Sequence, residues 1–261
     1  MPYFDCHIHL QDPLFHSDLD EVLRRGKEHC IEHFFCNGTE PNDWEAVYRL
    51  AVEHEEIVPF YGLHPWYVEQ STDWEETLIR FLETDFGDDK YRPGVGEIGL
   101  DFFRKPKNDA AQIQAFRRQL QIAKEWELPV SLHAVRAMNE MVSILHEEGP
   151  FPAILLHSFS GPIDRMEQLQ KLGCFFSFSA NLLKAKNQRI REAAIAVQES
   201  RILLESDAPA LAPQYGQRNE PTVVPAILAE LAALRAVPEE RLRETVYENS
   251  RRFLRYLRRG T

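Results

Sequence analysis

The chain has 261 residues, of which 44% are hydrophobic, a composition that supports a sizeable core and argues against intrinsic disorder. Its formal net charge is −11, the wrong sign for tight, non-specific coating of nucleic acid, and the surplus of carboxylates suits a protein that binds metal cations. No basic start followed by an apolar run is present, and no apolar stretch reaches membrane-spanning length. We therefore expect a soluble, cytoplasmic protein without a membrane segment.

Short runs rich in β-branched, aromatic or leucine residues recur eight times along the chain. Such runs are typical of strands buried in a parallel sheet. They cover residues 3–9, 33–38, 57–63, 93–99, 129–133, 153–157, 175–179 and 201–207.

The segments between these runs have the apolar spacing of helices, most clearly at 18–30, 109–126 and 238–257. Alternating strands and helices indicate a parallel α/β architecture, and eight repeats favour a closed (β/α)₈ TIM barrel over an open sheet. No linker rich in glycine, serine or proline divides the chain, so we expect one domain over residues 1–261. The longest expected loop, 208–220, follows the eighth strand.

Potential metal ligands occur near the ends of five predicted strands. In a barrel these ends meet on one face, where active sites of this fold are built. Six such side chains are too many for one tetrahedral zinc ion and suit two metal ions bridged by a carboxylate. Each residue alone also has an ordinary structural explanation, so the prediction rests on their joint occurrence. The six are His7, His9, Glu97, His133, His157 and Asp207.

Side-chain parity along a strand supports this grouping. Because side chains alternate between faces, His7 and His9 point the same way and can chelate one ion. Glu205 shares its parity with Asp207, so we expect it one layer deeper, positioning the groups around the metals.

Several motifs resemble those of the TatD family of metal-dependent deoxyribonucleases, within the amidohydrolase superfamily. The resemblance spans essentially the whole chain, and the combination of the motifs at 96–102 and 205–209 is specific. The motifs are HIH at 7–9, GLHP at 62–65, GEIGLDF at 96–102, LHSFSG at 156–161, ESDAP at 205–209, RNEP at 218–221 and NSRRF at 249–253.

This resemblance implies a (β/α)₈ barrel with divalent-metal-dependent deoxyribonuclease activity, in some members a 3′→5′ exonuclease. Carried over to this chain, one metal ion would be held by His7, His9, Glu97 and Asp207. The second would be held by Glu97, His133 and His157, with Glu97 as the bridge. The family commonly has H-x-R after the fifth strand, whereas here Arg136 is displaced by one position.

The expected chemistry is phosphodiester hydrolysis by a water molecule that two metal ions activate. Asp207 would orient this water and accept its proton. His64, in a turn after the third strand, would donate a hydrogen bond to a phosphate oxygen or simply cap the strand. The mixed ligand set leaves Mg²⁺, Mn²⁺ and Zn²⁺ open.

Cationic and aromatic residues in the loops of the same face favour an anionic substrate that contains bases. We expect DNA that enters as a single-stranded end, with Arg104 and Arg218 as substrate-binding residues beside His64, and no obligate protein partner. The other loop residues in this set are Lys105, Lys107, Lys184, Lys186 and Arg189, with the aromatic Trp66, Tyr67, Phe102 and Phe103.

Two other functions fit parts of the same pattern. The first is hydrolysis of another small ester, lactone or amide on the same scaffold, since one fold hosts many chemistries. Against it, the fifth strand has no lysine near its end to form a carbamylated bridge. The second is a metal-stabilised protein-interaction or quality-control factor, against which the complete ligand set argues.

Overall fold

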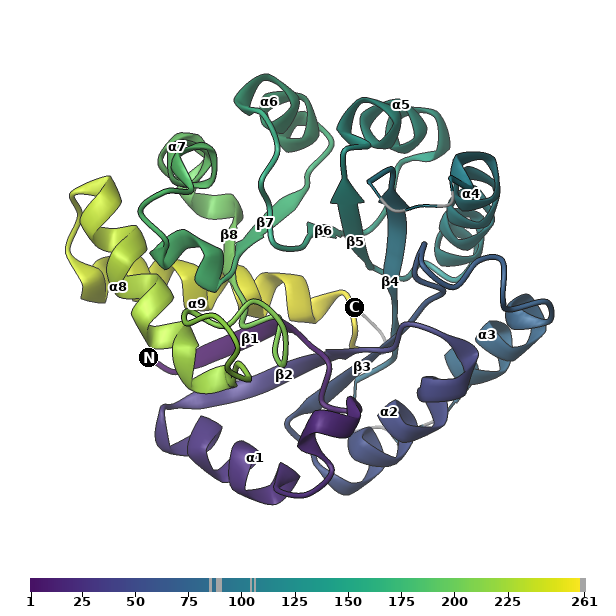
Figure 1. Cartoon of the computed structure of the whole chain (residues 1–261), viewed down its shortest axis with the longest axis horizontal. Helices are drawn as coiled ribbons and strands as arrows, with labels where there is room; N and C mark the ends of the chain where they lie inside the picture. The colour runs from purple at the N-terminus through teal and green to yellow at the C-terminus, as the bar shows by residue number, and fades with distance from the viewer. Residues whose placement is uncertain (85, 88–90, 104, 106, 259–261) are drawn as a thin grey trace.

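The computed structural model describes residues 1–84, 86–87, 91–103, 105 and 107–258. Within them, eight strands pair in chain order, every neighbouring pair being parallel, and helices surround the sheet (Figure 1). This confirms the predicted (β/α)₈ TIM barrel. The strands are β1 Tyr3–Ile8, β2 Ile31–Asn37, β3 Ile57–Tyr61, β4 Gly94–Asp101, β5 Val130–Val135, β6 Ile154–Leu156, β7 Phe175–Phe178 and β8 Ile202–Leu204.

The helices turn one apolar side toward the strands. In α4, for example, Phe116, Leu120 and Ala123 are buried, as their spacing of three and four residues predicts. The α-helices are α1 Leu19–Glu28, α2 Pro41–Glu53, α3 Trp74–Leu82, α4 Asp109–Glu125, α5 Met138–Glu148, α6 Ile163–Lys171, α7 Gln188–Ala196, α8 Val224–Arg235 and α9 Glu239–Arg255. Short 3₁₀ helices are η1 Pro13–Phe15, η2 Ala180–Leu183, η3 Glu199–Arg201 and η4 Pro221–Val223.

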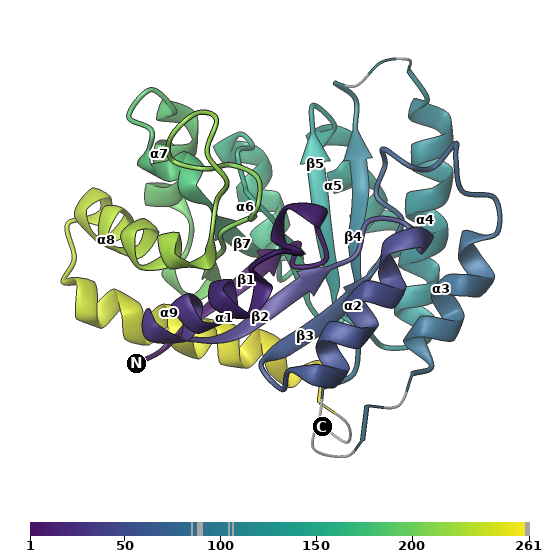
Figure 2. The same ribbon diagram turned by 60° about the horizontal axis from the view of Figure 1, so that its bottom comes forward.

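The two ends of the barrel differ. At the amino-terminal ends of the strands, α9 lies across the barrel (Figure 2), and its Phe253 and Leu254 pack in one apolar cluster with Phe4 and Phe35. At the carboxyl ends, the segment after β8 joins β1, because the Asp207 amide donates to the His7 carbonyl at 3.0 Å. Because α9 covers the amino-terminal ends of the strands, a site can open only at their carboxyl ends.

The strand ends differ from the predicted ones where the candidate ligands lie. β4 extends to Asp101 and β5 to Val135, so Glu97 and His133 lie within their strands. β8 ends at Leu204, and Asp207 has a left-handed φ of +56°. The parity argument for Glu205 and Asp207 therefore does not apply, because both residues lie beyond the strand.

Among the described residues, no single helix is both long and apolar enough to cross a membrane. The segments Pro221–Arg235 and Glu239–Arg255 meet the length and composition criterion only as a pair, with a bend of 116° between them.

Candidate functional site

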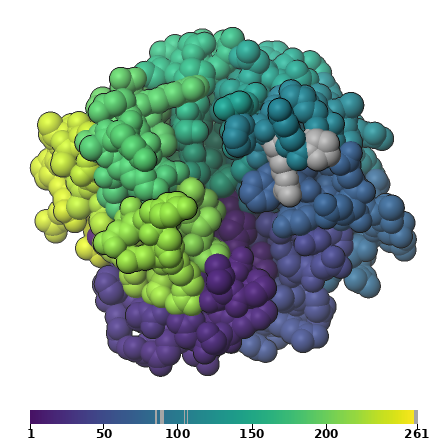
Figure 3. All heavy atoms as spheres, viewed as in Figure 1, coloured from purple at the N-terminus to yellow at the C-terminus, as the bar shows by residue number. Residues whose placement is uncertain are grey.

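A cavity of about 570 Å³ opens at the carboxyl ends of the strands. Five of the six predicted ligands line it, and the sixth, His7, is completely buried. Figure 3 shows this face of the molecule hollowed near its centre, where segments from both halves of the chain meet. The lining ligands are His9, Glu97, His133, His157 and Asp207.

Glu97 lies at the centre of the site, and its two carboxylate oxygens face different histidines. Oε2 lies 3.3 Å from His7 Nε2 and 3.5 Å from His9 Nε2. Oε1 lies 2.9 Å from both His133 Nδ1 and His157 Nε2. Each carboxylate oxygen of Glu97 therefore faces its own pair of histidines, which is the arrangement of a ligand that bridges two metal ions.

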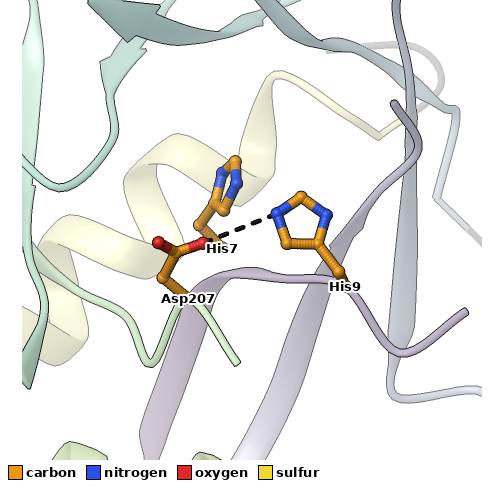
Figure 4. A group of neighbouring side chains, drawn as sticks. All are labelled: His7, His9 and Asp207. Atoms are coloured by element: carbon orange, nitrogen blue, oxygen red, sulfur yellow. Dashed lines mark ion pairs between the residues drawn. The ribbon is translucent and has the colours of Figure 1, made fainter. Parts of the chain in front are cut away.

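Asp207 completes the group on the Oε2 side. Figure 4 shows its carboxylate beside His7 and His9. The Asp207 Oδ1 atom lies 3.5 Å from His9 Nε2. One ligand atom from each of these three residues lies within 4.8 Å of the other two. The segment after β8 thus supplies a carboxylate to a histidine pair that β1 provides.

Outer contacts fix how the two β1 histidines are turned. His9 Nδ1 lies 2.8 Å from the Asn37 carbonyl, which can only accept, so Nδ1 carries a proton and Nε2 is the nitrogen that faces Glu97 and Asp207. His7 Nδ1 lies 3.1 Å from Ser131 Oγ, and the buried His7 Nε2 has no hydrogen-bond partner. Ring nitrogens that face carboxylates need a cation between them, either a proton or a metal ion, so these side chains fit a metal ion that displaces the protons.

The electrostatics of the site keep its carboxylates ionised. Burial alone would raise the pKa of Glu97, but charge on His157, His64 and His7 holds it well below its usual range. Burial likewise opposes ionisation of Asp207, but the hydrogen bond from His9 and the charge of His157 lower its pKa. These carboxylates in turn favour the protonated form of His9: despite burial, Asp207 and Glu97 raise its pKa to about 9. The ionised carboxylates and the imidazole nitrogens beside them form a ligand set that a divalent cation can bind once the imidazoles give up their protons.

Glu205 lies beneath His157 and is completely buried. Its Oε1 atom lies 3.5 Å from His157 Nδ1 and accepts a hydrogen bond from the Ser158 amide at 2.7 Å. The hydroxyl of Ser177 donates to the other oxygen. These contacts hold the Glu205 carboxylate in a position to orient the His157 ring.

His64 enters the site from the turn after β3. The Trp66 amide donates to His64 Nδ1 at 3.2 Å, so the ring proton is on Nε2, which lies 3.4 Å from Glu97 Oε1. Burial lowers the pKa of His64 to about 4, despite the opposing charge of Glu97, so the ring is neutral at pH 7. With its proton on Nε2, His64 can donate a hydrogen bond into the cavity but cannot ligate a metal through that atom.

Asp101 and His16 belong to the site although neither was assigned a role from the sequence. Asp101 Oδ2 accepts from Trp66 Nε1 at 2.7 Å and lies 3.5 Å from His133 Nε2. Asp101 has the same parity as Glu97 on β4 and belongs to the motif at 96–102, so both signals were available. His16 lines the cavity because η1 brings the loop after β1 to it.

The structure does not place Arg218, one of the two arginines predicted to bind substrate, at the cavity, since it is not among the described lining residues. Its guanidinium donates to Asp18 at 2.6 and 2.7 Å and to Glu220 at 2.7 Å, and it lies over the ring of Phe15. These pairs tie the segment after β8 to the start of α1. Arg104 lies outside the described residues.

We expect Arg218 to act through this ion pair. Arg218→Ala and Asp18→Asn should each lower the thermal midpoint by a few degrees at most, and the double variant little more. The hydrogen bond from Arg218 lowers the pKa of Asp18 from 3.8 to about 2, so the stabilisation is present above pH 3.8 and is lost as the pH falls through about 2. Scanning calorimetry should thus give the same difference in thermal midpoint between each variant and the wild type at pH 5 and at pH 8. A KM effect of Arg218→Ala that Asp18→Asn does not share would instead indicate a substrate contact.

Comparison with known proteins agrees with this geometry. The family model described as TatD related DNase matches residues 4–255. A 3′-5′ ssDNA/RNA exonuclease TatD from Erwinia tasmaniensis is 31% identical over 95% of this chain and 98% of its own length. The deoxyribonuclease TATDN3 from Homo sapiens is 28% identical over 97% of this chain and 95% of its own length.

A solved structure shares the arrangement of the whole barrel. The crystal structure of YJJV, a TatD homologue from Escherichia coli K12, superposes with a TM-score of 0.90 at 27% identity and covers 97% of this chain and 98% of its own. The family match spans the barrel from β1 to the end of α9 and so includes every candidate ligand. The chain is thus a member of the TatD family of metal-dependent hydrolases.

Proposed function

We propose that the protein is a metal-dependent deoxyribonuclease that hydrolyses phosphodiester bonds from single-stranded ends, in the 3′→5′ direction. The observation that carries this proposal is Glu97, whose two oxygens face separate histidine groups at 2.9 to 3.5 Å. Family membership supports the nucleic-acid substrate, as do the names of the exonuclease and deoxyribonuclease relatives.

The site would hold two divalent ions, Mg²⁺, Mn²⁺ or Zn²⁺. His7, His9 and Asp207 would hold one, and His133 and His157 the other, with Glu97 between them. When bound, such ions would neutralise phosphate charge and lower the pKa of a water molecule toward neutral pH. The neutral Nε2–H of His64 supports a role as donor to a phosphate oxygen.

Asp207 would accept the proton of the attacking water, because its carboxylate stays ionised and lies at the cavity wall. Glu205 would act from beneath by orienting His157. Trp66 and Tyr67 line the cavity, where an unpaired base can stack on an aromatic ring. A cavity of this size suits one strand rather than a duplex, which supports the preference for single-stranded ends.

We further propose that residues 1–261 act as one domain, since the family match runs through nearly all of them. The cytoplasmic location and the lack of an obligate protein partner stay predictions. Lactonase or phosphotriesterase chemistry has only fold-level support, from organophosphorus hydrolase and lactonase structures 14–15% identical to this chain.

The test is hydrolysis by the metal-reconstituted protein of single strands labelled at either end, beside a panel of esters and lactones. The proposal predicts stepwise release of nucleotides from the 3′ end of the strand. Efficient turnover of a lactone or ester, with both labelled strands intact at full metal occupancy, would instead support the other hydrolase.

A further inference from the structure

A second cavity lies beside the candidate active site, at the carboxyl ends of β4, β5 and β6. It has a volume of about 610 Å³, and its lining includes Phe102, Val135, Arg136, Gly161 and Arg189. None of these residues has a part in the proposed metal centre. The cavity brings a residue that follows β5 together with one from α7, far apart in the sequence.

Arg136, which lies one position later than the arginine of the family's H-x-R motif, stacks on an aromatic ring. Its guanidinium lies 4.3 Å from the ring centroid of Phe103, a residue that is 60% exposed. Arg136 is itself exposed and forms no ion pair with a carboxylate in the described part of the chain. Stacking on a ring orients the guanidinium while leaving its N–H groups available to a ligand.

Arg189 is the second cation of this cavity. It is exposed and, as far as the described residues extend, has no carboxylate partner. Arg191, two residues later on α7, pairs with Glu230 at 2.6 Å. The one carboxylate among the described lining residues is Glu140, so two arginines and one acid line this cavity in a chain of net charge −11. This imbalance favours an anion.

The second cavity is connected to the metal centre through two neighbouring strands. In the sheet register Asp101 of β4 pairs with Val135 of β5, and the Asp101 carboxylate lies 3.5 Å from His133 Nε2. Arg136 follows His133 by three residues, so their Cα atoms lie within about 10 Å. If a single-stranded nucleic acid has its scissile phosphate at the metal centre, the neighbouring phosphates of its backbone would lie near this cavity.

We propose that the Arg136–Arg189 cavity binds a phosphate of the nucleotide chain next to the one being cut. Arginine suits this role because its planar fork donates two parallel hydrogen bonds to phosphate oxygens. The inference rests on the proposed nuclease function and adds to it the place where the uncleaved part of the strand is held. The two arginines then set affinity for oligonucleotides, independently of base sequence.

The test compares the double variant Arg136→Ala, Arg189→Ala with Arg251→Ala, Arg255→Ala, which removes the same charge from exposed positions on α9 at the other end of the barrel. Binding of fluorescein-labelled octathymidylate to the full chain is measured by anisotropy in EDTA over a range of NaCl concentrations. The first variant should bind about tenfold more weakly or worse, and the slope of log K against log salt should become shallower by about 0.7, for the one phosphate contact that is lost.

A kinetic comparison separates this site from the metal centre. In the Mn²⁺-loaded enzyme, the ratio of kcat/KM for the octamer to that for bis(p-nitrophenyl) phosphate should fall about tenfold in the first variant, since the small diester has one phosphate. Arg136→Lys, Arg189→Lys should restore part of that ratio. Affinity and salt slope equal to those of the α9 control would overturn the inference. Failure of the wild type to cleave either substrate would contradict the proposed function, while the anisotropy result still decides the inference.

Discussion

Replacing Glu97 by alanine is expected to abolish hydrolysis and to lower the metal content while the barrel stays folded. Glu97 is the one carboxylate within 3.5 Å of five imidazoles in the described site, so its loss removes the shared ligand of both proposed ions. We expect the rate to fall by roughly three orders of magnitude or more.

The measurement pairs elemental analysis with the hydrolysis rate on the same sample, and circular dichroism reports the fold. Glu97→Gln keeps the shape of the side chain but removes its charge, so it should also lose metal. Glu45→Ala, an exposed carboxylate on α2, serves as the matched control. Near-normal activity of Glu97→Ala at wild-type metal content would show that the bridging role is wrong.

The second large effect is expected for Asp207→Asn. The amide oxygen can still coordinate an ion, so most of the metal site should remain, with a modest loss of affinity because the charge is gone. If Asp207 accepts the water proton, the rate should fall by a factor of roughly 10²–10⁴, the usual contribution of a positioned base. The remaining rate should rise with pH as hydroxide becomes available.

Single-turnover rates at saturating metal, with occupancy measured on the same sample, separate the two roles of Asp207. Loss of rate in proportion to loss of metal would leave Asp207 a ligand only, as would full occupancy with an unchanged rate. Full occupancy with a rate at least a hundredfold lower is what the proton-transfer role predicts.

Periodicity and ligand placement made the barrel and its six candidate ligands predictable from sequence. Strand parity suggested the pairing of His7 and His9; His7 lies in β1, His9 directly follows its end, and both rings face Glu97. Glu205 and Asp207 illustrate the limit of that rule. The left-handed backbone at Asp207 follows the end of β8, and such a turn has no period-two signal.

Contacts between loops were beyond local patterns. Arg218 carries a charge in the expected loop, but the acid that binds it, Asp18, is 200 residues away, so the sequence suggested a substrate contact. His16 reaches the cavity only because η1 folds toward it. By contrast, Asp101 could have been found from the sequence, since it shares the parity of Glu97 and belongs to the motif at 96–102.

The central claim, a two-ion centre that cuts phosphodiester bonds, is tested most directly by titrating metal-free protein with Mn²⁺ while following release of nucleotide from a 3′-labelled single strand. Bound metal is measured in the same samples. The account predicts that the rate rises to a plateau as occupancy approaches two ions per chain. Full activity at one ion per chain, or two bound ions with the strand left intact, would contradict it.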